Sequence, residues 1–249
     1  MNRRDFLKGI AVGAAAALWP GRVRAFGDTS KYIPAVARHG GRWDTRPNGL
    51  RRLCWEVSQR TSAEVFPEAR PFGLADQALF RYPFLYFGGE GPFPPLSPDE
   101  VGNLRRWITW GGFMLADAND GSNGDGFDAS FRREIARVLP GSPLSRLSAD
   151  HVVYRSYYLL DRHGGRLLVR PFMEAAMVGR RAAVIYSQND LAGAWSRDEH
   201  GDWDFQCSPG GESQREVALR TGINLVFYAL CLDYKEDAVH LPFIMKRRR

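Results

Sequence analysis

The chain has 249 residues, a formal net charge of +6 and three cysteines, and 44% of its residues are hydrophobic. This length can bury a substantial core in one α/β domain. The positive charge lies at the ends, because the net charge is +2 without residues 1–25 and −2 when the basic tail Lys246–Arg249 is also left out. The charge balance of the body therefore gives no indication of a nucleic-acid-binding surface, and no nucleic-acid partner is expected. The tail would either be solvated or make a weak contact with anionic lipid.

The N-terminus carries the marks of an export signal. Arg3 and Arg4 precede an apolar run over residues 9–19 and the small-residue site VRA at residues 23–25. This pattern predicts a twin-arginine signal peptide over residues 1–25, since the apolar run is shorter than the ~20 residues that a membrane span needs. We expect a periplasmic or otherwise exported protein, with one α/β domain over residues 26–249.

The first half of that domain alternates apolar runs with amphipathic segments. Residues 31–38 and 83–87 are typical of buried strands, and residues 63–66 of a short one. Between them, Asn48 can cap a helix whose apolar residues recur at the i, i+3, i+4, i+7 spacing of one buried face. Ser97, Pro98 and Glu100 form a capping box for the next helix, and Gly111 and Gly112 end it.

The second half continues the alternation. Residues 113–117 (FMLAD) predict a third strand, and Asp128 caps the helix after it. Residues 175–178 and 181–187 flank Gly179 and Arg180 as a hairpin or tight strand pair. Residues 213–234 predict a helix buried against the sheet, with an apolar stretch too short for a membrane span. Strands alternating with helices indicate an α/β fold, a mostly parallel sheet with helices on both faces.

Ligands of open α/β sheets bind beyond the carboxyl ends of the strands. The segments that follow the predicted strands are glycine-bearing, polar or acidic, as a binding site would require. The candidate ligand-binding residues there are Gly40, Gly41, Asp44, Gly88, Gly89, Glu90, Asp117, Asn119, Asn189 and Asp190.

Several of these residues have a functional and a structural interpretation. Asp117, with Asp120, could hold a divalent cation, or it could form a turn through its own backbone. The glycines around Glu90 could present N–H groups to an anion, or allow a tight turn before two prolines. His151 could be a general base or a partly buried structural residue. The candidate catalytic groups are therefore Asp117, Glu90 and His151, and their distances would decide the role.

The three cysteines differ in their expected positions. Cys54 and Cys231 lie in apolar segments and predict core positions, while Cys207 in DFQCSPGG is the exposed candidate. Twin-arginine substrates usually fold in a reducing cytosol, so no disulfide is expected to be required for folding.

A series of motifs runs from about Tyr32 to the C-terminus: GGRWD, YFGGEG, LSPDEVGNLRRWITWGGFMLADANDG, SADHVVYRSYYLL, AAVIYSQNDLAGAW, TGINLVFYAL and YKEDAVHLPFIMKRRR. In this order they resemble the domain of unknown function 4159 family of exported or envelope bacterial proteins. That family resembles the class I glutamine amidotransferase fold, a flavodoxin-like sheet also found in trehalose-utilisation-type proteins. The resemblance implies the same α/β architecture. It does not carry the activity over, since no cysteine here stands in the G-x-C-x-G context that amidotransferases use.

Three functions remain open at this point. The first is a non-amidotransferase domain that binds a small polar ligand or an envelope partner. The second is a hydrolase acting on a carbohydrate or envelope compound, with a divalent cation or carboxylates assisting. The third is a structural component of an envelope complex, with aromatic surface from the PFPP and WITW segments.

Overall fold

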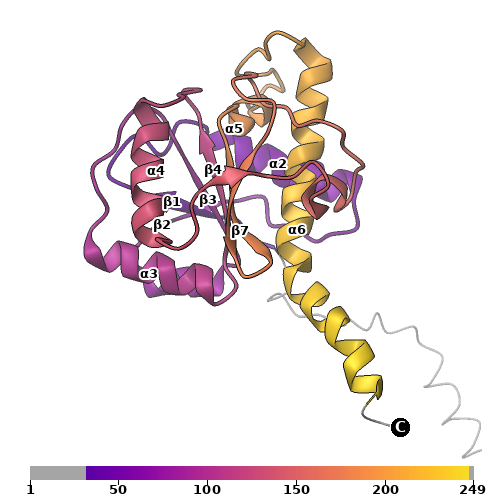
Figure 1. Ribbon diagram of the computed structural model, residues 1–249. Helices are drawn as coiled ribbons and strands as arrows, with labels where there is room; N and C mark the ends of the chain where they lie inside the picture. Colours follow the sequence, from indigo (N-terminus) through magenta and orange to yellow (C-terminus); the bar gives the residue numbers. More distant parts are fainter. Residues whose placement is uncertain (1–31, 247–249) are drawn as a thin grey trace, which may run out of the picture. The chain divides into compact units, whose positions relative to one another are not determined.

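The computed structural model describes the backbone of residues 32–246 and the side chains of residues 32–230 (Figure 1). Its centre is a seven-stranded sheet in the order β2-β1-β3-β4-β7-β6-β5. Five strands are parallel: β1 (Ala35–Arg38), β2 (Arg70–Gly73), β3 (Phe84–Gly89), β4 (Phe113–Ala118) and β7 (Arg181–Ser187). The other two, β6 (Glu174–Val178) and β5 (Ser145–Arg146), extend one edge antiparallel. The predicted mostly parallel α/β sheet is confirmed.

Helices cover both faces of the sheet (Figure 1). One face packs against α2 (Pro47–Arg60), α5 (Leu191–Trp195) and α6 (Gly211–Lys246), and the other against α3 (Pro98–Thr109) and α4 (Gly126–Val138). Two short 3₁₀ helices, η3 (Gln77–Arg81) and η4 (Val152–Arg155), lie in connections. Side chains of β3 alternate between the two cores, with Phe84 and Tyr86 in one and Leu85 and Phe87 in the other. A strand buried on both faces is apolar at every position for this reason.

Several predicted element boundaries are confirmed. The capping box of α3 is present, with Ser97 at the N-cap and Glu100 as its partner. The segments 175–178 and 181–187 form the antiparallel pair β6 and β7. The helix predicted over residues 213–234 is present as α6. It begins two residues earlier than predicted, at Gly211, and continues to Lys246.

Other boundaries differ from the prediction. The N-cap of α2 is Arg46 rather than Asn48, because Pro47 already stands in the first turn. Helix α4 begins two residues before Asp128, whose carboxylate instead accepts a hydrogen bond from the Gly124 N–H. The expected strand at residues 63–66 is a single bridge between Val65 and Tyr32, and the edge strand β2 follows it. Both the bridge and β2 depend on pairing with a distant segment, which local pattern does not reveal.

In the part of the chain that the structure describes, no helix is both long and apolar enough to cross a membrane. The predicted signal peptide and the last three residues of the basic tail lie outside the described residues.

Candidate functional site

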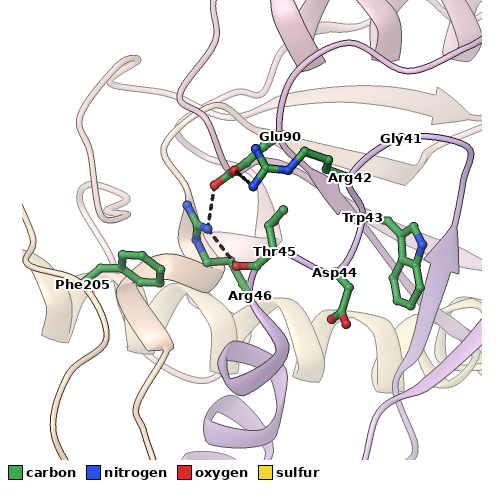
Figure 2. Close-up of a pocket in the computed structure, with 8 residues that line it drawn as sticks. All are labelled: Gly41, Arg42, Trp43, Asp44, Thr45, Arg46, Glu90 and Phe205. Carbon is green, nitrogen blue, oxygen red and sulfur yellow. Dashed lines mark hydrogen bonds and ion pairs between the residues drawn. The ribbon is translucent and has the colours of Figure 1, made fainter.

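A cavity of about 580 Å³ lies at the carboxyl ends of β1 and β3 (Figure 2). The strand order reverses here, since β2 pairs with one side of β1 and β3 with the other. Such a switch point leaves a crevice because the two following loops diverge. The cavity is lined by Gly41, Arg42, Trp43, Asp44, Thr45, Arg46, Glu90 and Phe205.

Arg46 holds this end of the sheet together. Its Nη1 donates to the Thr45 carbonyl and to Glu90 Oε1, both at 2.8 Å, and its Nη2 donates to the Asn119 carbonyl at 2.8 Å and to Asp190 Oδ2 at 3.0 Å. Its Nε donates to Asp190 at 3.2 Å. All five N–H groups of the guanidinium are therefore used. Arg46 positions the loops after β1, β3, β4 and β7 and has no donor left for a ligand.

Asp190 is the second centre of this buried network. It has a left-handed backbone with φ of 52°, and its carboxylate caps α5 by accepting from the Gly193 N–H at 2.9 Å. Arg46 and Arg166 both pair with this carboxylate, which is fully buried. A buried carboxylate with two cationic partners and a helix N-terminus is well compensated. Its interactions are all internal to the fold.

Asp117 ends β4 and is also fully buried. Its oxygens accept from the N–H groups of Leu191 and Ala192, both at 2.9 Å, and from the Tyr86 hydroxyl at 3.0 Å. Burial and the nearby charge of Asp190 raise the pKa of the Asp117 carboxyl to about 7, although these hydrogen bonds act in the opposite direction. Asp117 thus attaches α5 to the sheet, so the structural interpretation accounts for its contacts.

Asn119 links the residues around it. Its Nδ2 lies 2.9 Å from the Tyr86 hydroxyl, 3.0 Å from Asp117 and 3.2 Å from Asp190, while its Oδ1 accepts from Thr45 at 2.8 Å. Through Asn119 and Arg46 the structure brings together Glu90, Asp117, Asn119 and Asp190, which the sequence analysis selected from three separate segments.

Glycines at the end of β3 and in the loop after β1 allow close packing. A Cβ on Gly88 would lie 2.3 Å from the Tyr86 hydroxyl oxygen, and one on Gly89 would lie 2.8 Å from the Arg42 carbonyl. Gly40 and Gly41 pack in the same way against Pro94 and Phe93. Of the four, only Gly41 lines the cavity. Other segments of the same chain approach these positions so closely that only glycine fits there.

Asp120 has internal partners too. It accepts from the N–H groups of Gly91 at 2.7 Å and Ser122 at 2.9 Å. Although burial acts to raise it, such hydrogen bonds hold the pKa of Asp120 below its ordinary value. Among the described residues, no group of three or more His, Cys, Asp or Glu side chains is arranged to hold a metal ion. Asp117 and Asp120 remain candidates for a cation only as a hypothesis.

Asn189 and His163 hold the neighbouring loop in place. Asn189 exchanges hydrogen bonds with the backbone of Arg170, at 2.8 and 2.9 Å, and its Nδ2 lies 2.9 Å from His163 Nε2. Burial lowers the pKa of His163 to about 4, so the ring is neutral and accepts this hydrogen bond. The sequence analysis did not select His163, because nothing in RHGGR distinguishes it from a loop histidine.

His151 lies elsewhere. It is the N-cap of η4, and its ring centroid lies 5.4 Å from that of Tyr228. The Tyr228 hydroxyl accepts from the Ala182 N–H near the start of β7, whereas Asp117 pairs with Ser187 at the end of the same strand. Five residues of strand span about 16 Å. His151 therefore lies near the amino ends of the parallel strands, whereas Glu90 and Asp117 lie at their carboxyl ends. This is too far apart for one reaction centre.

The cysteines and aromatic segments also have defined positions. Cys54 is buried as predicted, and burial raises its pKa to about 12. The prediction that Cys207 is exposed is wrong, since its side chain belongs to the core beside α6. The side chain of Cys231 lies outside the described residues. In the PFPP and WITW segments, Phe93 and Trp107 are buried, which leaves Trp110 as the exposed aromatic side chain.

The groups that a ligand can reach are those at the mouth of the cavity. The Arg42 side chain is 75% exposed, and among the described residues its one ion pair joins Nη2 to Glu90 Oε2 at 3.1 Å. Asp44 is exposed and Trp43 half-buried, and neither side chain has a hydrogen-bond partner among the described residues. The Phe205 ring closes the other side, 4.3 Å from the Arg46 guanidinium carbon. The cavity can thus offer donors from Arg42 and Trp43, an acceptor from Asp44, and two aromatic surfaces.

The fold and this cavity define an α/β protein with a polar crevice at the switch point of its parallel strands. The chain belongs to the family described as Domain of unknown function (DUF4159), which matches residues 32–230. A twin-arginine translocation pathway signal sequence matches residues 1–18, so the protein is exported by that pathway. No curated protein matches the chain. The predicted family and export route are confirmed.

Proposed function

We propose that this protein binds a small polar ligand in the cavity between the loops after β1 and β3, without amidotransferase chemistry. The observation that carries the proposal is the set of accessible polar groups at its mouth: Asp44 and Trp43 have no side-chain hydrogen-bond partner among the described residues, and Arg42 has N–H groups beyond its ion pair with Glu90. Arg42 suits a carboxylate or another acceptor, and Asp44 suits hydroxyl, amide or ammonium donors. Trp43 supplies an aromatic surface. The ligand therefore combines an acceptor group with hydrogen-bond donors.

The rigid setting of the cavity supports binding. Arg46 connects four loops, so the lining residues are held before a ligand arrives, and a preformed site loses less entropy on binding. A hydrolase that uses Asp117, Glu90 and His151 has less support. His151 lies near the opposite ends of the strands, and the Asp117 carboxylate already accepts hydrogen bonds from the first N–H groups of α5.

The same proposal covers the setting of the domain. We infer one domain over residues 26–249 after cleavage behind Ala25, acting in the periplasm. The parallel strands follow the order β2-β1-β3-β4-β7, which matches the flavodoxin-like order 2-1-3-4-5 and supports a relation to the class I glutamine amidotransferase-like fold.

The test is calorimetric titration of the purified protein with three sets of compounds: amino acids, neutral monosaccharides and uronic acids. We expect at least one compound to bind, and Arg42→Gln or Asp44→Asn to weaken it at least about tenfold, or about 1.4 kcal/mol. Arg180→Gln is the matched control and should leave binding unchanged, because it lies in the turn between β6 and β7, at the start of β7 rather than at the carboxyl ends of the parallel strands. Absence of binding to every compound, or binding that survives both cavity variants, would overturn the proposal.

A further inference from the structure

A second cavity of about 390 Å³ lies beside the first turn of α2. It shares Trp43, Asp44 and Arg46 with the first cavity, so the segment carrying these residues separates two adjoining spaces. The rest of its wall is mostly apolar, unlike the wall of the first cavity. Its apolar members are Val36, Pro47, Leu50, Pro67, Ala69, Pro71 and the ring of Tyr86.

The polar groups of the second cavity are at its rim or already engaged. Arg51 and Glu68 are exposed, and Asn48 is bonded to Arg51 at 2.6 Å. Tyr86 is 3% exposed, and its hydroxyl is bonded to Asp117, so Tyr86 offers the cavity its ring rather than its hydroxyl. An apolar group entering here would leave water without stranding a buried donor or acceptor.

We propose that the second cavity is an apolar subsite for the same ligand, and this inference rests on the proposed function. The ligand is then amphipathic: its charged, hydrogen-bonding part lies against Arg42 and Asp44, and an aromatic or alkyl part passes Trp43 into the second cavity. Trp43 and Asp44 belong to both walls, so a ligand held by them has direct access to both spaces. Selectivity would come from the polar cavity, while added affinity would grow with the apolar area buried in the second.

The probe is 8-anilinonaphthalene-1-sulfonate, whose sulfonate suits Arg42 and whose rings fluoresce more strongly in apolar surroundings. Methanesulfonate, with the same anionic group and almost no apolar part, is the matched comparison. We expect saturable binding of the aromatic probe at one site and at least tenfold weaker binding of methanesulfonate. Ala69→Phe, which fills the second cavity, should weaken the aromatic probe at least tenfold, and Arg42→Gln should weaken it several-fold.

Ala75→Phe is the control, since it makes the same change in the turn after β2 and does not line the cavity. Pro67→Trp, at an exposed position of the same wall, is a second blocking variant if Ala69→Phe does not fold. Equal binding by wild type and both blocking variants overturns the inference. So does binding that depends on Ala69 but not on Arg42, because the two cavities would then act separately. If polar compounds still bind through Arg42 in either case, the proposed function stands and only the apolar subsite is lost.

Discussion

Replacing Arg46 by methionine tests whether this side chain holds the polar end of the sheet together. The variant Arg46→Met keeps much of the side-chain volume but removes every hydrogen bond of the guanidinium. The Arg46 side chain is only 5% exposed, so water cannot replace the lost donors. We expect a large loss of stability with little change in the apolar core.

The size of the loss follows from what each partner keeps. Asp190 retains Arg166 and the Gly193 N–H, and Glu90 retains Arg42 and partial contact with solvent. Removing one member of a buried pair costs about 3–5 kcal/mol when the partner is left alone, so the Asp190 contribution is near the lower end of that range. The two carbonyls that lose a donor add to it, at about 1 kcal/mol or more each. We expect a total of about 4–5 kcal/mol, a large part of the 5–15 kcal/mol typical of a folded domain.

Urea unfolding followed by tryptophan fluorescence measures this loss, since the chain has seven tryptophans. Arg46→Lys keeps the charge but has three donors instead of five, and we expect it to lose about 1–3 kcal/mol. Arg51→Met, in the exposed part of the same helix, should change the free energy of unfolding by less than about 0.5 kcal/mol. A loss below about 1 kcal/mol for Arg46→Met would refute the assignment of Arg46 as the central positioning residue.

Three further predictions concern the buried polar groups. The raised pKa of Asp117 means that its stabilising contribution, relative to Asp117→Asn, is greatest below about pH 4 and falls as the pH rises to about 7; urea unfolding from pH 4 to 8 should show the difference narrowing, and a widening difference would contradict it. The lowered pKa of His163 has the opposite effect, so stability relative to His163→Gln should be complete above about pH 6.5 and decline toward pH 4; parallel curves for the two proteins would show that His163 is not buried and neutral. Gly88→Ala would force the Tyr86 hydroxyl away from Asp117 and should lower the melting temperature through a loss of about 1–3 kcal/mol, whereas Gly102→Ala, where a Cβ meets nothing within 4 Å, should be neutral or stabilising.

The sequence predicted the strands and helices well where their signal is local. Residues 83–87 and 113–117 are continuously apolar because β3 and β4 are buried on both faces, and this pattern survives without knowledge of their neighbours. The capping box at Ser97 was predictable for a similar reason, since its partners are three residues apart. The edge strand β2 was missed because its pairing with β1, rather than its sequence RPFG, makes it a strand.

The site shows the limit of the same reasoning. The loops that follow strands could be selected, and Glu90, Asp117, Asn119 and Asp190 do lie together. Arg46 could not be recognised as the common partner of Glu90, Asn119 and Asp190, because its ion pair with Asp190 joins residues 144 positions apart. Arg166 and Phe205 reach the same network from two further connections. Conversely, His151 was a candidate catalytic residue in the sequence, but it lies near the opposite ends of the strands from this network.

The sequence by itself therefore determined the export route, the family, and the alternating strands and helices, since each depends on residues close together in the chain. The tertiary structure decided which polar groups are occupied and which remain open to a ligand. Asp117 and Asp120 are taken up by backbone N–H groups, Cys207 is covered by the core, and Arg42 and Asp44 remain exposed. The reason is physical: a residue's type sets what it can bond to, but strand order and loop packing set which partners come within 3 Å of it.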